Sequence, residues 1–297
     1  MDLKKYNKHS NHSIVQHTPP LCYELSGERF VLQMDDGDDY ILDFKSEDIL
    51  EWTWKEEHSK QEKYVCLKSD DQIYLISFEV EGAIQRANHT FVIDKESMLV
   101  TRVVATVGKN KRWPYLISTD IVFGAIWQEG VEFEPFPRHS FTSDMIGTVV
   151  EWAYGSELST THIYFDAHFY RITYTRSRVE SLEQAREEYA FNNMANLPSS
   201  DEPTEYIRIK EGVYFVIMTE RNCEKVLGPQ VPWRSNTHGF LQNYNSGGYV
   251  VARAFGTSTI DGVDRATNII DGAYGYFIGP ADDELKAKLT DINPFIY

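Results

Sequence analysis

Three side chains in the second half of the chain are of types that together could carry out acid–base chemistry. Arg171 lies in HFYRITY, Glu220 ends the apolar run YFVIMTE, and Tyr154 lies in EWAYG. A guanidinium can hold a carboxylate through two hydrogen bonds, a carboxyl group in an apolar cavity can transfer a proton near neutral pH, and a phenol can orient a ligand. We therefore predict a metal-free catalytic site in which Arg171 anchors the ligand, Glu220 moves the proton and Tyr154 orients the ligand. The same residues also fit an exposed Arg and Glu at strand ends with a tyrosine in the core.

Four further residues are predicted to contact the ligand. Trp152 and Tyr170 flank two of the catalytic candidates and would form walls of the pocket, and His238 and Tyr214 lie on neighbouring strands of the same module. His238 has a counterpart in the first half, His89, and each lies beside a threonine. A packed or hydrogen-bonded strand histidine is therefore the alternative to a ligand contact at this position.

Cofactor and metal sites have no matching pattern in the sequence. There is no GxGxxG, GxxxxGK[ST] or GxSxG motif, so nothing indicates a dinucleotide site, a triphosphate site or a serine nucleophile. Neither HxH nor HExxH occurs, and His162 and His168 are too loosely spaced to indicate a metal. We expect no cofactor and no bound metal.

The elements that must position these residues are short strands. The first half contains the segments RFVLQM, DDYILDF, ILEWTW, KYVCLK, QIYLISFEV, HTFVID and MLVTRVVATV, which alternate or form β-branched and aromatic runs between turn residues. Asp36-Gly37 between two of them is a hairpin signal. A twisted meander of this many strands leaves no unpaired edge strand if its first and last strands pair. This predicts a closed antiparallel up-and-down barrel with room for one small ligand.

The chain repeats this pattern once. Residues 64–94 correspond to 206–243, the stretch from Leu25 corresponds to that from Met145, and Tyr64 should superpose on Tyr206 and Tyr74 on Tyr214. The predicted organisation is a flexible leader over 1–20, a first barrel over 21–130, a linker around 130–139 and a second barrel over 138–297. The second barrel would include a helix over 181–194 and, after Gly256, an extension without a repeat partner.

Composition limits the partners. The formal net charge of −16 repels nucleic acid and anionic membranes, and the longest apolar runs are too short to span a bilayer. Cys22, Cys66 and Cys223 are far apart in the sequence and form no CxxC pair, which favours reduced thiols in a cytoplasmic protein. We expect neither nucleic acid nor a membrane as a partner.

A family resemblance rests on the strand segments of the first half. LSGERFVLQMDDGDDYILDF, ILEWTW and the run from KYVCLK to HTFVID resemble the N-terminal domain of the MoaF family, and the second half resembles its C-terminal domain. The resemblance covers roughly residues 21–256. It implies an all-β fold of two tandem lipocalin-like (calycin) antiparallel barrels with short helices, and it suggests a link to molybdenum cofactor biosynthesis.

A more distant resemblance reaches the phenolic acid decarboxylases, which are small cofactor-free barrels. Their YxY, Tyr-Arg-Ile and Trp-Thr-Glu strand motifs are similar in order to Trp152-Ala153-Tyr154, Tyr170-Arg171-Ile172 and Met218-Thr219-Glu220. Trp152 replaces one tyrosine, which weakens the case for decarboxylation. The first half has Leu32 and Met34 at the tyrosine positions and Thr53 at the arginine position, so its equivalent site is predicted to be blank.

These observations predict a double barrel whose second barrel binds a small organic ligand. It would be a cofactor-independent lyase or isomerase acting on a small aromatic or unsaturated acid or carbonyl compound. The alternative is a non-catalytic carrier or accessory factor linked to molybdenum cofactor biosynthesis. The first barrel could instead serve only for packing or for a homodimer.

Overall fold

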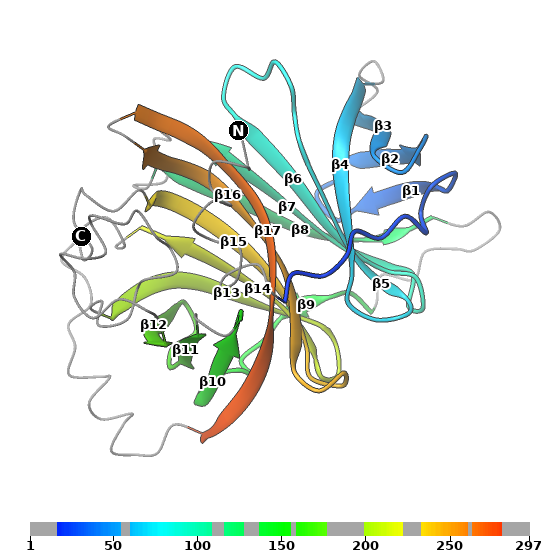
Figure 1. The fold of residues 1–297 in the computed structure, drawn as a ribbon. Coiled ribbons are helices and arrows are strands. Elements are labelled where there is room, and N and C mark those ends of the chain that lie inside the picture. The colour runs from blue at the N-terminus through cyan, green and yellow to red at the C-terminus, as the bar shows by residue number, and fades with distance from the viewer. Residues whose placement is uncertain are drawn as a thin grey trace. The chain divides into compact units, whose positions relative to one another are not determined.

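The chain folds into β-strands throughout the part that the computed structural model describes, residues 17–54, 60–108, 116–127, 137–155, 159–176, 199–221, 233–260 and 263–280. Seventeen strands and no helix occur among these residues (Figure 1). The helix predicted over 181–194, most of the predicted leader and linker, and the chain after residue 280 lie outside the described residues. The predicted all-β fold of two closed antiparallel barrels is confirmed.

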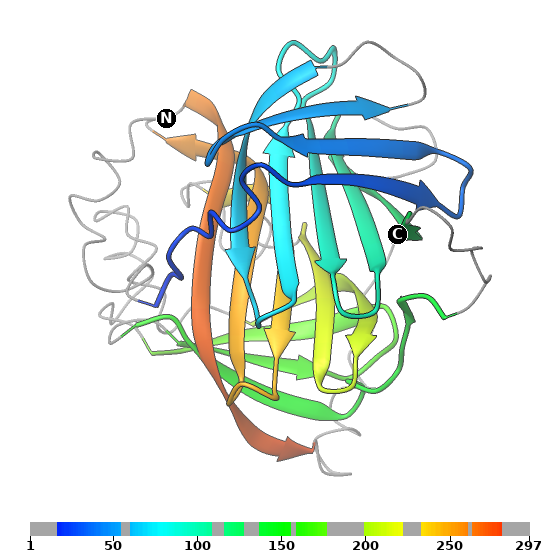
Figure 2. The ribbon, with the colours of Figure 1, turned by 90° about the vertical axis from the view of Figure 1, so that its right-hand side faces the viewer.

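The first barrel is a ring of eight strands that follow one another along the chain (Figure 2). Its strands are β1 (Arg29–Met34), β2 (Asp39–Phe44), β3 (Ile49–Trp54), β4 (Lys60–Lys68), β5 (Ile73–Glu79), β6 (Ala87–Asp94), β7 (Leu99–Val107) and β8 (Ile117–Ile126). β1 and β2 bury every second residue, as their alternating sequence predicts. The predicted hairpin at Asp36-Gly37 joins them, and Gly37 has a φ of 83°, which favours glycine. Pairing of β1 with β8 closes the ring.

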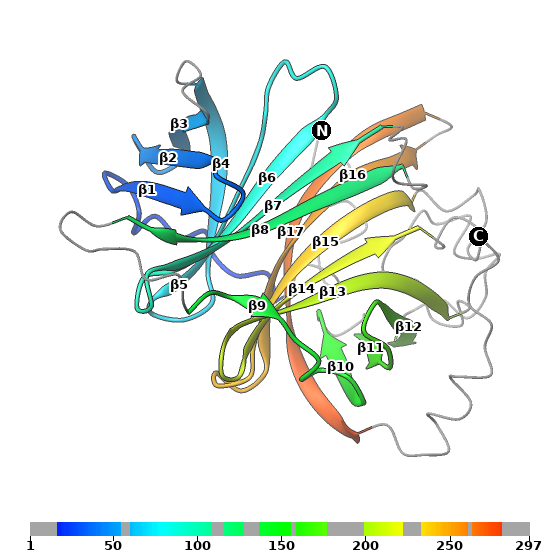
Figure 3. The ribbon, with the colours of Figure 1, turned by 180° about the vertical axis from the view of Figure 1, so that it is seen from behind.

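The second barrel repeats this order. Its strands are β10 (Thr148–Ala153), β11 (Ser159–Tyr164), β12 (Phe169–Arg176), β13 (Ser200–Lys210), β14 (Val213–Glu220), β15 (Trp233–Asn243), β16 (Tyr249–Ile260) and β17 (Val263–Pro280). β10 pairs with β17 and β12 pairs with β13, so the eight strands form a closed ring. The short strand β9 (Ser140–Phe141) adds to β13 outside the ring (Figure 3).

Both barrels begin with the same turn. Gly27 and Gly147 have φ values of 86° and 89°, which a side chain would disfavour. Their N–H groups donate to the carbonyl oxygens of Phe44 and Tyr164 at 2.7 and 2.6 Å. Each turn thus fixes the start of the first strand against the end of the second in the same way.

The repeated tyrosines on β4 and β13 also behave alike. The Tyr64 hydroxyl donates to the carbonyl oxygen of Ser46 at 3.0 Å, and the Tyr206 hydroxyl donates to that of Phe169 at 3.2 Å. Both rings are buried, and each acceptor lies just before or at the start of the third strand of its barrel. These matching contacts support the repeat inferred from the sequence.

The last strand of each barrel is not among those that the sequence predicts. The residues after Gly256 are expected to be an extension without a repeat partner, but up to Pro280 they complete β16 and form β17. β17 pairs with β10 just as β8 pairs with β1, so it is the counterpart of β8. Small and polar residues in DGAYGYFIG weaken the local strand signal, and pairing with a distant first strand supplies the missing stabilisation.

His17 belongs to the predicted leader and lies against the second barrel. The Nδ1 atom of His17 is 2.9 Å from the carbonyl oxygen of Ala153, and the Tyr249 hydroxyl donates to the carbonyl oxygen of His17 at 2.9 Å. His17 is therefore ordered by polar contacts rather than free in solvent.

A close approach between β10 and β17 makes Gly275 intolerant of a side chain. Trp152 pairs with Gly275, and a Cβ atom at position 275 would overlap the indole ring. At the corresponding place in the first barrel, Leu32 pairs with Ile126. At this position the second barrel therefore pairs a large residue with a glycine, and the first barrel pairs two residues of intermediate size.

We expect Gly275→Ala to lower the free energy of unfolding by about 1–3 kcal/mol, because the methyl group would overpack against the indole. Chemical denaturation measures the change. In a Trp152→Leu background the overlap is absent. Gly275→Ala should therefore lower the free energy of unfolding less in that background than in the unmodified protein. A Gly275→Ala protein of unchanged stability would contradict this packing.

Candidate functional site

The interior of the second barrel holds a continuous set of buried polar and aromatic side chains. Strand alternation directs them inward from six strands of the closed ring. The set comprises the buried residues Trp152, Tyr154, Thr160, His162, Tyr164, Tyr170, Glu220, His238, Gln242 and Asp271. Buried polar groups on this scale require partners.

A buried histidine–carboxylate hydrogen bond lies at one end of this set. The Nε2 atom of His238 is 3.1 Å from a carboxylate oxygen of Glu220, and each side chain is 8% exposed. Burial opposes the charged imidazolium, but the Glu220 carboxylate outweighs it and raises the pKa of His238. The histidine ring stacks on Phe240, whose centroid is 5.4 Å away. The structure therefore brings two of the predicted site residues, Glu220 and His238, into direct contact.

Asp271 is a third titratable group in this cluster, and the sequence analysis misses it. It lies on β17 opposite Ala252 and is 8% exposed. Among the described residues its Oδ1 atom has no hydrogen-bond partner. Burial raises the pKa of Asp271 to about 6, and the Glu220 carboxylate adds to the shift while His238 opposes it. Asp271 is thus a carboxyl group able to gain or lose a proton near neutral pH.

Tyr154 joins the same cluster from the end of β10. Its side chain is buried, and burial raises the pKa of its hydroxyl well above the usual range, with further contributions from Asp271 and Glu220. A side-chain hydrogen bond with Thr160 acts in the opposite direction. Tyr154 therefore keeps its proton at neutral pH and can donate a hydrogen bond.

A hydrogen-bonded chain continues from Thr160 to the far side of the barrel. Thr160 Oγ1 lies 3.1 Å from His162 Nε2, and His162 Nδ1 lies 3.4 Å from the Tyr164 hydroxyl. That hydroxyl accepts from Trp152 Nε1 at 3.2 Å and from Gln242 Nε2 at 2.9 Å. Burial lowers the pKa of His162 to about 3, so this imidazole is neutral. The network fixes the orientation of the predicted pocket wall, Trp152.

The other two predicted ligand contacts differ in their surroundings. The Tyr170 ring is buried and lies 5.0 Å from the ring of His162, inside the barrel. Tyr214 is only half-buried on β14. Tyr170 therefore belongs to the interior wall, whereas Tyr214 is more exposed than the residues of the cluster.

The structure does not bring Arg171 to Glu220. Arg171 pairs with Asp201 on the neighbouring strand β13, with Nε to Oδ1 at 2.6 Å and Nη2 to Oδ2 at 2.8 Å. Its neighbours Tyr170 and Ile172 are the buried, inward residues of β12, so alternation directs Arg171 to the outer face. The expected role of Arg171 as an anchor inside the barrel is therefore corrected. The apolar pair flanking Arg171 was the sequence signal for this orientation.

We expect Arg171→Ala to leave ligand binding by the second barrel unchanged and to lower the free energy of unfolding by about 1–3 kcal/mol, because it leaves the largely buried Asp201 carboxylate without its partner. Asp201→Asn serves as the matched variant, since it breaks the same pair from the other side. Ligand-detected NMR and thermal denaturation give the two readouts. A loss of affinity for Arg171→Ala alone would return this residue to the site.

Two titratable groups of the cluster, Tyr154 and Asp271, have no titratable counterpart in the first barrel. The strand registers place Met34 where the second barrel has Tyr154, and Val122 where it has Asp271. His89 is retained, but burial together with the positive charge of Arg102 lowers its pKa to about 3. By the same registers Glu51, not Thr53, occupies the position of Arg171. These differences support the prediction that the first barrel has no equivalent acid–base site.

Comparison with known protein families gives a match in the first part of the chain. Residues 11–109 match the family model described as MoaF N-terminal domain, which confirms the predicted resemblance over that part of the chain. No curated protein matches the chain. The described residues include no group of three or more His, Cys, Asp or Glu side chains arranged to hold a metal, and they include no helix long and apolar enough to cross a membrane.

The MoaF match and the double-barrel fold support a small-molecule-binding barrel. The geometry also shows that the buried acid–base groups lie in the second barrel. Two carboxyl groups, one imidazole and one protonated phenol meet inside the second barrel. The first barrel instead holds apolar and aromatic side chains together with the buried His89 and Arg102.

Proposed function

We propose that the second barrel binds a small organic molecule in its interior and catalyses a proton transfer on it without a metal, as an isomerase or a lyase. The observation that carries this proposal is Asp271, a buried carboxyl group whose Oδ1 atom lacks a hydrogen-bond partner among the described residues. It interacts electrostatically with the Glu220–His238 pair. A buried polar atom without a partner is costly unless a bound molecule satisfies it.

The roles follow from the protonation states. A carboxylate of Glu220 or Asp271 takes a proton from the carbon next to a carbonyl group, forming an O–H bond as the C–H bond breaks. The electron pair moves onto the carbonyl oxygen, and the protonated Tyr154 hydroxyl donates a hydrogen bond to it. Return of the proton to a different carbon yields an isomer, and departure of a group from the neighbouring carbon yields a lyase reaction. His238 balances the charge of Glu220.

The substrate class follows from the charge of the cluster. Arg171 lies on the outer face and pairs with Asp201, so it is not available to neutralise an anionic ligand inside the barrel. Two carboxyl groups disfavour an anionic ligand. We therefore favour an uncharged, unsaturated or aromatic carbonyl compound over the corresponding acid. The aromatic rings of Trp152 and Tyr170 suit a planar molecule.

A carrier remains the second candidate, favoured by the MoaF match in the first barrel. In that case the cluster would hold a ligand through hydrogen bonds and charge without exchanging protons. The low number of cysteines, which form no CxxC pair, supports placing either function in the cytoplasm.

One experiment separates the two candidates. The full chain is incubated in D₂O with a panel of small aromatic and unsaturated carbonyl compounds and their acids, and proton NMR follows both ligand binding and loss of signal at the carbon next to the carbonyl. Exchange catalysed by the protein supports the enzyme. Binding without exchange supports the carrier, and binding of no compound in the panel would count against both.

A further inference from the structure

Two cysteines that are distant in the sequence meet in the first barrel. Cys22 lies in the segment before β1 and Cys66 lies in β4, a separation of 66 − 22 = 44 residues. The Cys22 N–H donates to the carbonyl oxygen of Cys66 at 2.8 Å. Cys22 is half-buried, Cys66 is buried, and both are free thiols.

The geometry permits a covalent bond between them. Backbone segments joined by such hydrogen bonds run about 5 Å apart, inside the roughly 4.4–6.8 Å range of Cα separations seen in disulfides. Their side chains also face the same space. After burial, the charge and side-chain hydrogen bond of Cys22 are the next causes that raise the pKa of the Cys66 thiol.

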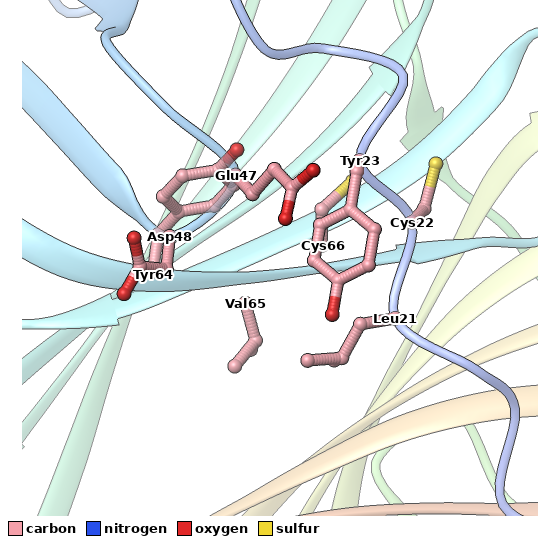
Figure 4. Close-up of a pocket in the computed structure, with 8 residues that line it drawn as sticks. All are labelled: Leu21, Cys22, Tyr23, Glu47, Asp48, Tyr64, Val65 and Cys66. Atoms are coloured by element: carbon pink, nitrogen blue, oxygen red, sulfur yellow. The ribbon is translucent and has the colours of Figure 1, made fainter.

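A pocket gives small molecules access to the two sulfur atoms. Cys22 and Cys66 line a cavity of about 330 Å³ together with Tyr23, Glu47 and Asp48 (Figure 4). Liquid water takes roughly 30 Å³ per molecule, so the cavity admits an oxidant of a few atoms. The two carboxyl groups disfavour an anionic oxidant and favour a neutral one.

We propose that Cys22 and Cys66 are a reversible oxidation site at which a hydroperoxide converts the two thiols into a disulfide. The more accessible Cys22 thiolate attacks the O–O bond, forming an S–O bond and releasing water or an alcohol, which gives a sulfenic acid. The sulfur of Cys66 then displaces the hydroxyl group as water, and the S–S bond forms. The two thiols supply the two electrons and two protons that reduce the peroxide.

Burial of Cys66 sets the rate of the second step. Because its pKa is raised, little of it is thiolate at neutral pH, and the thiolate is the attacking form. The rate of disulfide formation should therefore keep rising with pH beyond about 8.5, where an unperturbed thiol is already half deprotonated. The disulfide would join the segment before β1 to β4 and close a loop of 44 residues. We expect it to raise the unfolding midpoint by roughly 5 °C or more.

The test uses the full chain with its three cysteines. Protein is exposed to hydrogen peroxide, unfolded in an alkylating reagent without reductant, digested, and examined by mass spectrometry. We expect two of the three thiols to escape alkylation, a linked peptide pair containing Cys22 and Cys66, and full recovery of the thiols with dithiothreitol. The thermal midpoint should rise on oxidation and return on reduction.

Three variants control the result. Cys223→Ser should still lose two thiols, whereas Cys22→Ser and Cys66→Ala should form no linked pair. Cys22→Ser changes a half-buried residue, so a folding defect is not expected to obscure it. The proposal is overturned if all three thiols remain alkylatable, if the linked pair contains Cys223, or if Cys22 gains oxygen atoms without forming a link. None of these readouts depends on the activity proposed for the second barrel.

Discussion

Glu220→Gln should reduce turnover by the second barrel about 10²–10⁴-fold, the usual contribution of a positioned acid or base. The amide keeps the size of the side chain but cannot take a proton, and it leaves His238 without its carboxylate at 3.1 Å. Ligand affinity should change less than turnover, since shape and aromatic contacts are retained. The measurement is the rate of solvent deuterium incorporation into a compound that the screen identifies, together with its affinity from ligand-detected NMR.

Glu205→Gln is the matched control for this variant. Glu205 is also a partly buried carboxyl group of the second barrel, on β13, but its partner is His168 at 3.6 Å and it lies outside the cluster. It should retain full turnover. Equal losses in both variants would point to a general effect on the barrel, and unchanged turnover in Glu220→Gln would remove this residue from the mechanism.

Asp271→Asn should stabilise the protein at pH 7.5 by up to ~3 kcal/mol, the free energy that corresponds to raising a carboxyl pKa from 3.8 to about 6. The folded-state pKa of Asp271 is above its unfolded value, so the folded protein binds the extra proton. Its stabilising contribution is fully present below about pH 4 and is lost as the pH rises through about 6. An amide is uncharged over this range and avoids the loss.

The expected stability difference therefore depends on pH. It should be small near pH 4 and largest above about pH 7, as measured by urea unfolding of both proteins across this range. Asp271 also helps to raise the pKa of His238, so the variant gives up that attraction and the value is an upper limit. Asp39→Asn, at an exposed position, should show no such trend. A constant difference at all pH values would show that Asp271 is not the titrating group.

A stabilised but inactive Asp271→Asn protein would connect the two predictions. Residues that carry chemistry often lower stability, because they hold charge in a buried site that a neutral residue would occupy at less cost. The buried Asp271 carboxyl has this property, and the apolar Val122 stands at its place in the first barrel.

Several features of the site could be read from the sequence. The residue types and strand positions of Glu220 and Tyr154 predict a role for both, and the structure places both in one buried cluster. Arg171 could have been assigned to the outer face, because the apolar Tyr170 and Ile172 on either side of it occupy the other face of β12. Asp271 lies in a stretch that the sequence analysis interprets as an extension and not as a strand of the barrel. The alternation of its neighbours was therefore not used to place its side chain inside the barrel.

The sequence by itself determined the fold class, because side-chain alternation and turn glycines such as Gly37 and Gly147 act over a few residues. It also determined the repeat, visible in Tyr64 and Tyr206. The tertiary structure alone decided which strands close each ring. It also decided that Asp271 interacts with Glu220 and that Cys22 contacts Cys66. These contacts join positions far apart along the chain, and local periodicity carries no information about which distant strand a residue will face.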